Sequence, residues 1–210
     1  MTAPCPPASL QRPAPIGPTS QATQASIVLV GMMGAGKSTV GRHLAQQLDC
    51  PFADVDREIE RAEQCSVADI FAQRGEGAFR HLERVTIKRL LKSAPAGGVQ
   101  VIALGGGAWA QPEVRHMVRA TPHCRSVWLQ ADPATLRQRV AKQQPTRPLL
   151  AGTDPEAALE CLLAQRAAAY GEAEIHLPAQ GGVEQILAAL LAKLADHPLM
   201  PPLPPIPGTP

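Results

Sequence analysis

Five short runs of apolar residues alternate along the chain with longer segments that have a helical spacing. The runs are rich in β-branched residues and lie at 26–30, 51–55, 99–104, 126–129 and 174–177. Short apolar runs of this kind are typical of buried strands, and their alternation with helix-length segments predicts a parallel sheet joined by helical crossovers. We therefore expect an α/β fold in which helices cover both faces of the sheet.

Helical periodicity is clearest in two of the intervening segments. Val40, Leu44 and Leu48 recur at intervals of four, and the apolar residues of 183–194 form a broad stripe. Such spacing places the apolar side chains on one face of a helix. Both segments are therefore predicted to pack against the sheet.

The segment between the second and third predicted strands is too long for a single crossover. Ser66 is placed to cap the start of one helix, and Gly75 to Gly77 are expected to break the chain before another. Residues 142–155, rich in Gln, Pro, Gly and Thr, are predicted to form an exposed loop, and such loops beside a ligand site often act as lids. The predicted core thus carries a helical insertion and a lid.

The distribution of proline divides the chain into a middle and two tails. Six of the 22 prolines lie in residues 1–18 and seven in residues 198–210. Proline cannot donate the backbone hydrogen bonds that helices and sheets need, so residues 1–25 and 197–210 are predicted to be disordered. The alternative for the C-terminal tail is a polyproline II ligand for an SH3-like groove. Residues 26–196 have the ordinary size of one compact domain.

Charge, cysteine and hydropathy patterns exclude several classes of protein. The formal net charge is +2 without a long run of either sign, which gives no electrostatic footprint for nucleic acid or a membrane. The five cysteines have no CxxC spacing and indicate neither a disulfide framework nor a zinc site. No apolar run is long enough for a membrane span or a signal peptide. We expect a cytoplasmic protein with no nucleic-acid or membrane partner.

The sequence GMMGAGKST follows the first predicted strand directly and precedes the first predicted helix. Gly31, Gly36, Lys37 and Ser38 satisfy the pattern of a phosphate-binding P-loop in the strand–loop–helix context that the pattern requires. The backbone N–H groups of 34–38 would surround the phosphates, Lys37 would reach the β and γ oxygens, and Ser38 would ligate Mg²⁺. The chain is therefore predicted to bind a nucleoside triphosphate.

Two acidic residues follow the second predicted strand in the sequence FADVD. If the strand stays extended there, Asp54 and Asp56 project to the same side, at the edge of the sheet where ligands bind. One carboxylate could organise Mg²⁺ through water, and the other could orient or deprotonate an acceptor hydroxyl. The alternative is that Asp56 caps a helix beginning at Arg57.

Three glycines, at 105–107, stand where a P-loop motor or GTPase usually has an acidic residue for Mg²⁺. Bare backbone there would let a small ligand contact N–H groups, although a plain tight turn is the alternative. Arg80, Arg147 and Arg166 could bind a carboxylate or a migrating phosphoryl group, because guanidinium groups bind such oxyanions in a bidentate way. Exposed arginines are otherwise ordinary surface residues.

The ordered set of motifs GMMGAGKST, FADVDREIE, GEGAFR, GGGAW, RPLL and RAAAYGE resembles the shikimate kinase family over about 26–195. The resemblance implies a three-layer P-loop kinase fold related to nucleoside monophosphate kinases. This fold has a five-stranded parallel sheet flanked by helices, a substrate-binding helical insertion and a lid. The resemblance also implies a monomeric enzyme that transfers a phosphoryl group from ATP to the 3-hydroxyl of shikimate, in the pathway to chorismate and the aromatic amino acids.

The resemblance assigns roles to individual residues. Asp56 would hold the shikimate hydroxyls and act as the base, and Arg80 and Arg166 would bind the carboxylate. Asp54 would lie near Mg²⁺ together with Ser38, and Arg147 in the lid would close onto the phosphates. Backbone contacts to the substrate would come from Gly105, Gly106 and Gly107. Contacts to ATP would come from Gly34, Ala35, Gly36, Lys37, Ser38, Thr39, Arg139, Arg147 and Gln180.

Two other functions fit parts of the pattern. A related small-molecule kinase such as gluconate kinase would share the P-loop and the sheet, and a carboxylate clamp would suit gluconate too. The acid pair followed by GEGAFR and the glycine triplet favours shikimate. A nucleotide-sensing module is the non-catalytic alternative, and a sensor would not need a base such as Asp56.

Overall fold

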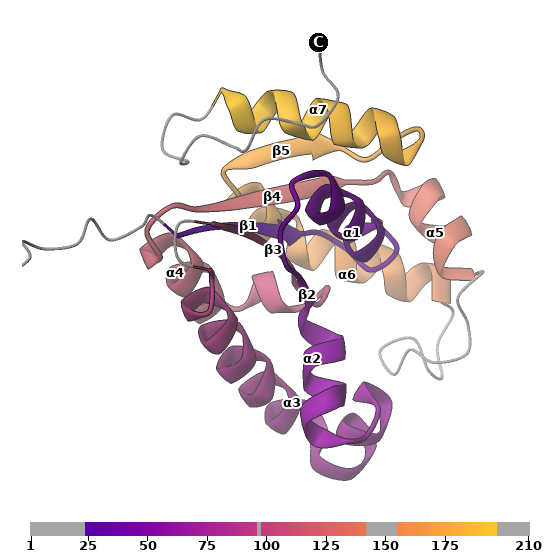
Figure 1. Cartoon of the computed structure of the whole chain (residues 1–210). Helices are drawn as coiled ribbons and strands as arrows, with labels where there is room; N and C mark the ends of the chain where they lie inside the picture. Colours follow the sequence, from indigo (N-terminus) through magenta and orange to yellow (C-terminus); the bar gives the residue numbers. More distant parts are fainter. Residues whose placement is uncertain (1–23, 96–97, 142–154, 197–210) are drawn as a thin grey trace, which may run out of the picture.

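The structure of the protein is a computed structural model that describes residues 24–95, 98–141 and 155–196 (Figure 1). Nearly all of both predicted tails lies outside these residues, as does most of the predicted lid at 142–155 with its Arg147. The domain boundaries near 25 and 197 therefore stay predictions.

The described residues form one five-stranded parallel sheet with the strand order β2-β3-β1-β4-β5. The strands are β1 (Ala25–Val30), β2 (Phe52–Asp54), β3 (Val99–Ala103), β4 (Cys124–Gln130) and β5 (Ile175–Pro178). Each lies on one of the five predicted apolar runs, with ends that differ by at most two residues. The prediction of a parallel sheet is confirmed.

The helices join the strands as crossovers or extend from the sheet. They are α1 (Lys37–Gln47), α2 (Val55–Glu63), α3 (Val67–Lys92), the 3₁₀ turn η1 (Ala108–Ala110), α4 (Pro112–Ala120), α5 (Pro133–Ala141), α6 (Pro155–Gly171) and α7 (Val183–Ala195). The predicted apolar stripe of α1 is buried at Val40 and Leu44, with Leu48 at its C-cap. In α7 the residues buried are Ile186, Leu187, Leu190 and Leu194.

The strand order explains how both faces of the sheet are covered. The chain moves from β1 toward β2 through α1, and in the opposite direction from β3 to β4 through α4. Parallel crossovers are right-handed, so helices on connections that run in opposite directions lie on opposite faces. Consistently, α1 packs against α7 on one face, while α4 packs against α3 and η1 on the other.

Helices α2 and α3 form the predicted insertion and project away from the sheet (Figure 1). Ser66 caps α3 as predicted, in a reciprocal capping box with Asp69. The break expected over Gly75 to Gly77 is a kink at Gly75 alone, whose φ of 78° is left-handed. Gly77 lies in the helical part that follows, so the predicted break is confirmed as a kink at Gly75 that divides α3 into two helical parts.

The second strand ends earlier than the sequence suggested. β2 stops at Asp54, which occupies the N-cap position of α2, and Asp56 lies in the first turn of that helix. The expectation of an extended chain through Asp56 was therefore wrong, and so was the alternative of a cap before a helix beginning at Arg57.

Within the described ranges, no helix combines the length and the apolar character needed to cross a lipid bilayer.

Candidate active site

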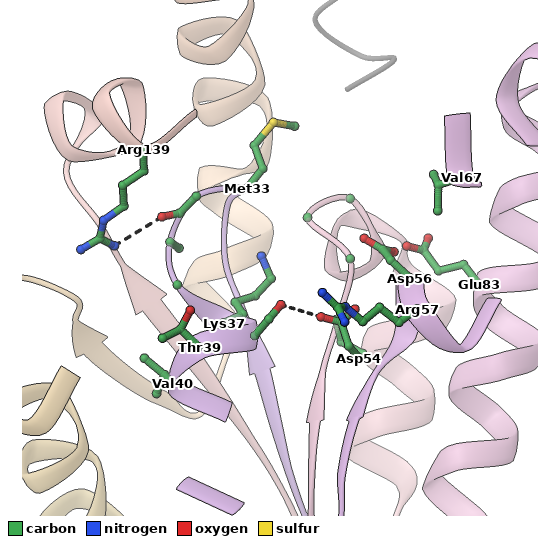
Figure 2. A pocket seen from close by; sticks show the side chains of 18 of the residues that line it. Met33, Lys37, Thr39, Val40, Asp54, Asp56, Arg57, Val67, Glu83 and Arg139 are labelled. Carbon is green, nitrogen blue, oxygen red and sulfur yellow. Dashed lines mark hydrogen bonds between the residues drawn. The ribbon is translucent and has the colours of Figure 1, made fainter. Parts of the chain in front are cut away.

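A cavity of about 760 Å³ opens at the carboxyl ends of β1, β2 and β3 (Figure 2). Its wall is built from the P-loop, the start of α2, both parts of the kinked α3, the glycine triplet and α6, with α7 at one end. This is the edge of a parallel sheet at which ligands bind, because the loops that follow the strands meet there. Each predicted site residue except Arg147, which lies outside the described residues, can be placed relative to this cavity.

The P-loop lines one end of the cavity. All six P-loop residues predicted to contact the nucleotide, from Gly34 to Thr39, belong to this lining. Gly34 and Gly36 have φ values of 80° and 95°, a region that only glycine adopts readily. A Cβ on Gly31 would lie 2.8 Å from the carbonyl oxygen of Leu129, so this turn must pass close to β4. The glycines thus let the backbone curl around a phosphate-sized space at the N-terminus of α1.

Lys37 is the first residue of α1, and its side chain is buried beneath the P-loop. Its Nζ donates to the carbonyl oxygens of Gly31, at 2.8 Å, and Met32, at 3.0 Å. These contacts place the ammonium group inside the curl of the loop, where it adds positive charge to the N-terminus of the helix. The position suits a group that binds the terminal phosphates.

Ser38 and Asp54 meet between α1 and the end of β2, as the dashed line in Figure 2 shows. The Ser38 hydroxyl donates to Oδ2 of Asp54 at 2.5 Å. A hydroxyl and a carboxylate are hard oxygen ligands of the kind that Mg²⁺ takes alongside phosphates and water. The pair therefore fits the predicted metal position.

Asp56 lines the cavity, and its Oδ1 lies against Gly105, 2.7 Å from the position that a Cβ would take there. Its Oδ1 is buried and has no hydrogen-bond partner among the described residues. Burial, followed by the negative charges of Glu83 and Asp54, raises the pKa of Asp56 to about 6. A carboxylate with a pKa near neutrality can accept a proton from a bound hydroxyl, which is the role predicted for this residue.

Arg80 lies on α3 and is held by two carboxylates of its own helix. Its Nη1 donates to Oε2 of Glu83 and its Nη2 to Oε1 of Glu76, both at 2.9 Å. The guanidinium also lies against the backbone of Gly107, where a Cβ would come within 2.6 Å of Nη2. A side chain at 107 would therefore displace the Arg80 guanidinium, which favours the functional interpretation of the glycine triplet over a plain turn.

Arg166 reaches the cavity from α6 and is almost fully buried. Its Nη1 donates to the carbonyl oxygen of Gly106 at 3.0 Å, and the hydroxyl of Tyr170 donates to the same oxygen at 2.5 Å. Because C=O and N–H of a trans peptide point in opposite directions, the two donors fix which way the N–H of Gly107 points. Arg80 and Arg166 therefore approach the same glycine backbone from two different helices.

Arg139 and Gln180, the predicted nucleotide contacts outside the P-loop and the lid, lie differently relative to the cavity. Arg139 on α5 lines the cavity, and its Nη1 donates to the carbonyl oxygen of Gly34 at 3.3 Å (Figure 2). Gln180 is exposed and is not among the residues that line the cavity, whereas its neighbour Gly181 is. Val183 and Ile186 of α7 supply apolar side chains at this end.

Sequence reasoning missed Glu83 and the apolar part of the wall. Glu83 is fully buried, and burial raises its pKa although the charge of Arg80 opposes that shift. Its spacing of three from Arg80 was the available signal, since such a spacing on a helix favours an ion pair. Val67, Phe71 and Phe79 also line the cavity, and the two phenylalanine rings lie 4.8 Å apart.

Comparison with known proteins decides the family of the chain. The family model described as shikimate kinase matches residues 33–195. The chain belongs to the shikimate kinase family. A shikimate kinase of Brucella canis is 42% identical over 172 residues, which cover 81% of this chain and 82% of that protein. The chain is therefore an ATP-dependent kinase with the P-loop kinase fold that the motifs predicted.

Solved structures separate the family from its relatives. The shikimate kinase of Acinetobacter baumannii, determined in complex with shikimate, is 35% identical, with a TM-score of 0.75 and coverage of 84% of this chain and 97% of that one. A gluconokinase from Sinorhizobium meliloti has a TM-score of 0.56 at 19% identity, with coverage of 82% and 93%. The likeness to the gluconokinase shows the shared fold alone. It therefore gives no support for gluconate as the acceptor of this chain.

Proposed function

We propose that the chain transfers the γ-phosphoryl group of ATP to the 3-hydroxyl of shikimate, giving shikimate 3-phosphate and ADP. The observation that carries the proposal is a single cavity that joins a P-loop to a wall with Arg80, Arg166 and two carboxylates, Asp56 and Glu83, each of which has one oxygen without a hydrogen-bond partner among the described residues. Membership of the family and the shikimate-bound relative support this choice of acceptor. The reaction belongs to the pathway to chorismate and the aromatic amino acids.

The phosphate end of the site binds and orients the donor. The backbone N–H groups of residues 34–38 surround the phosphates, and Lys37 neutralises charge on the β and γ oxygens. Ser38 and Asp54 would hold Mg²⁺, Ser38 directly and Asp54 through water, since their oxygens meet at this end of the cavity. The metal ion, when bound, supplies charge neutralisation at the phosphate oxygens.

The acceptor end binds a hydroxylated carboxylate. Arg80 and Arg166 would hold the carboxylate, and the backbone of the triplet at 105–107 would contact the ring hydroxyls. Asp56 would take the proton of the 3-hydroxyl on its carboxylate as the oxygen–phosphorus bond forms. The bond from the γ-phosphorus to the bridging oxygen breaks at the same time, and its electron pair leaves with ADP.

Several further assignments belong to the same proposal. Arg147 of the lid would close onto the phosphates, and Arg139 and Gln180 would lie beside the adenine. The enzyme would act as a cytoplasmic monomer with no nucleic-acid or membrane partner. Its Pro-rich tails, 1–25 and 197–210, would flank a single kinase domain.

A coupled assay of ADP release tests the proposal. Shikimate, gluconate and nucleoside monophosphates are supplied in parallel with ATP and Mg²⁺ to the full chain. We expect turnover with shikimate well above the rate with ATP alone and no comparable rate with the other acceptors. A shikimate rate equal to the ATP-only background would overturn the proposal.

A further inference from the structure

A second carboxylate beside Asp56 is held by donors from two parts of the chain. Oε2 of the fully buried Glu83 accepts from Nη1 of Arg80 at 2.9 Å and from Nε2 of Gln111 at 2.7 Å. Oε1 of Glu83 is buried and has no hydrogen-bond partner among the described residues. This oxygen lies against Gly105, 2.6 Å from the position that a Cβ would take there. Glu83 is therefore anchored through one oxygen and directed toward the glycine backbone with the other.

Gln111 occupies the N-cap position of α4, directly after the glycine triplet and η1. Its Oε1 accepts from Nη1 of Arg84 at 2.8 Å, while its Nε2 donates to Glu83. A guanidinium can only donate and a carboxylate can only accept, so these two partners fix the orientation of the amide. Arg84 therefore holds Gln111 with its N–H group toward Glu83.

Gln111 does not line the cavity, so its influence on a bound ligand must pass through Glu83. The titratable groups that face Glu83 are Arg80 on its own helix, Asp56 on α2, and Arg166 and Tyr170 on α6. Burial and Asp56 favour the neutral form of Glu83, whereas the arginines and the Gln111 hydrogen bond favour the carboxylate. Loss of the amide donor removes one of the few groups that keep Glu83 ionised.

The state of Glu83 decides how Arg80 is held. Glu76, the other partner of Arg80, is largely exposed, whereas Glu83 is buried on the inner side of the guanidinium. Protonation of Glu83 would weaken its ion pair with Arg80, and rotation would break the hydrogen bond, so the exposed Glu76 would become the stronger partner. The guanidinium would then leave its place over Gly107.

We propose that Gln111 is a positioning residue for acceptor binding: by donating to Glu83, it keeps that carboxylate paired with Arg80 and so sets the guanidinium that binds the acceptor's carboxylate. The inference rests on the proposed function, because it takes Arg80 as the acceptor-binding group. It assigns a role to a residue that contacts neither substrate.

Steady-state kinetics of Gln111→Met test the proposal, with Glu113→Gln as the matched control on the exposed side of the same helix turn. We expect the KM for shikimate to rise about tenfold, the effect of one lost hydrogen bond to a charged group, with kcat and the KM for MgATP nearly unchanged. The methyl ester of shikimate lacks the carboxylate, so its kinetics should be equal in wild type and variant. A similar loss for the acid and the ester would overturn the proposal.

Gln111→Glu keeps the size of the side chain and places a second carboxylate against Glu83. We expect a larger rise in the KM for shikimate at pH 8 than for Gln111→Met, and a smaller one as the pH falls and the pair takes up a proton. Wild-type behaviour of this variant at every pH would contradict the proposal even if Gln111→Met folds poorly.

A measurement without turnover separates this inference from the proposed function. The side-chain carboxyl of Glu83 is titrated by ¹³C NMR in the acceptor-free protein, in wild type and Gln111→Met. The pKa of Glu83 should be higher in the variant, and an equal pKa in both proteins would overturn the inference whatever the acceptor is. Failure of wild type to turn over shikimate would instead overturn the proposed function and leave the NMR result standing.

Discussion

The phosphate end and the acceptor end of the cavity are built in different ways. At the phosphate end, most binding groups are backbone N–H groups of one continuous stretch, 31–39, whose loop is closed by local bonds such as Ala35 N–H to Met32 O at 3.1 Å. Asp54 of β2 joins this stretch through its hydrogen bond with Ser38. The acceptor end combines side chains from α2, α3, α4 and α6, joined by hydrogen bonds between residues far apart in the chain, such as Gln111 to Glu83 and Arg166 to Gly106.

This difference has a physical consequence for how each end responds to mutation. Backbone donors are fixed by the fold, so the phosphate end depends on few side chains. Among these, Lys37 is a buried cation. The acceptor end depends on buried charges that hold one another, and removing one group there moves its partners. We therefore expect all-or-none effects at the phosphate end and graded effects, mostly on acceptor binding, at the other.

The largest effect is expected for Lys37→Ala. The phosphate charge loses its buried partner at the centre of the P-loop, so turnover should fall to the ATP-only background in the coupled assay. The far-ultraviolet circular dichroism spectrum should stay unchanged, since the loop is closed by backbone bonds. Lys193→Ala, on the exposed face of α7, is the matched control and should keep wild-type turnover. Wild-type rates for Lys37→Ala would remove this residue from the mechanism.

Asp56→Asn should lower kcat by about 10² to 10⁴ while leaving the KM for MgATP nearly unchanged, because the amide cannot accept the proton. In wild type, kcat/KM for shikimate should fall as the pH drops through about 6, the raised pKa of Asp56. A profile without this acidic limb would argue for another base.

The same substitution should stabilise the fold of the enzyme without metal or nucleotide. The pKa of Asp56 is higher in the folded than in the unfolded state, so its charge opposes folding above pH 6 and has no such effect below the ordinary aspartate pKa of about 4. Asp56→Asn should therefore raise the Tm at pH 7.5, and the gain should vanish below pH 4. A lower Tm at pH 7.5 would contradict the assignment of Asp56 as an unsatisfied buried charge.

The two ends also differ in how far the sequence predicted them. Strand positions, the P-loop and its cavity-lining residues followed from local patterns, because the chemistry of a phosphate loop is contained in one stretch of chain. Asp56 lines the cavity as expected, but the extended backbone conformation predicted for it was wrong. The sequence does not show that the strand is followed directly by a helix at Val55.

The partners of the charged groups could not be predicted from spacing alone. Glu83 was within reach of sequence reasoning, three residues after Arg80, but its contact with Gln111 spans 28 residues and depends on how α3 and α4 cross. Gln180 stays a prediction: it is exposed and does not line the cavity, whereas its neighbour Gly181 does.

Arg166→Ala tests the graded behaviour of the acceptor end. We expect the KM for shikimate to rise by about a hundredfold, because the buried guanidinium that would bind the acceptor carboxylate is lost. The kcat should change much less. The hydroxyl of Tyr170 still holds the carbonyl of Gly106, so the glycine backbone should stay in place. Arg119→Ala, an exposed arginine paired with Glu172, should leave both constants unchanged. An unchanged KM for Arg166→Ala would place the acceptor carboxylate elsewhere.

Gly107→Ala is the smallest change and the sharpest test of the wall. The φ of Gly107 is −101°, which alanine adopts without strain, so the effect must come from the methyl group, whose carbon would lie 2.6 Å from Nη2 of Arg80. The guanidinium must shift, because the alternative is movement of the backbone that Arg166 and Tyr170 hold. We expect the KM for shikimate to rise about tenfold, the effect of one misplaced charged hydrogen bond, with the KM for MgATP unchanged. Gly77→Ala, where a Cβ meets no atom within 4 Å, is the matched control. Equal KM values for shikimate in the two alanine variants would show that acceptor binding does not depend on the position of Arg80. The graded response expected of the acceptor end would then be contradicted.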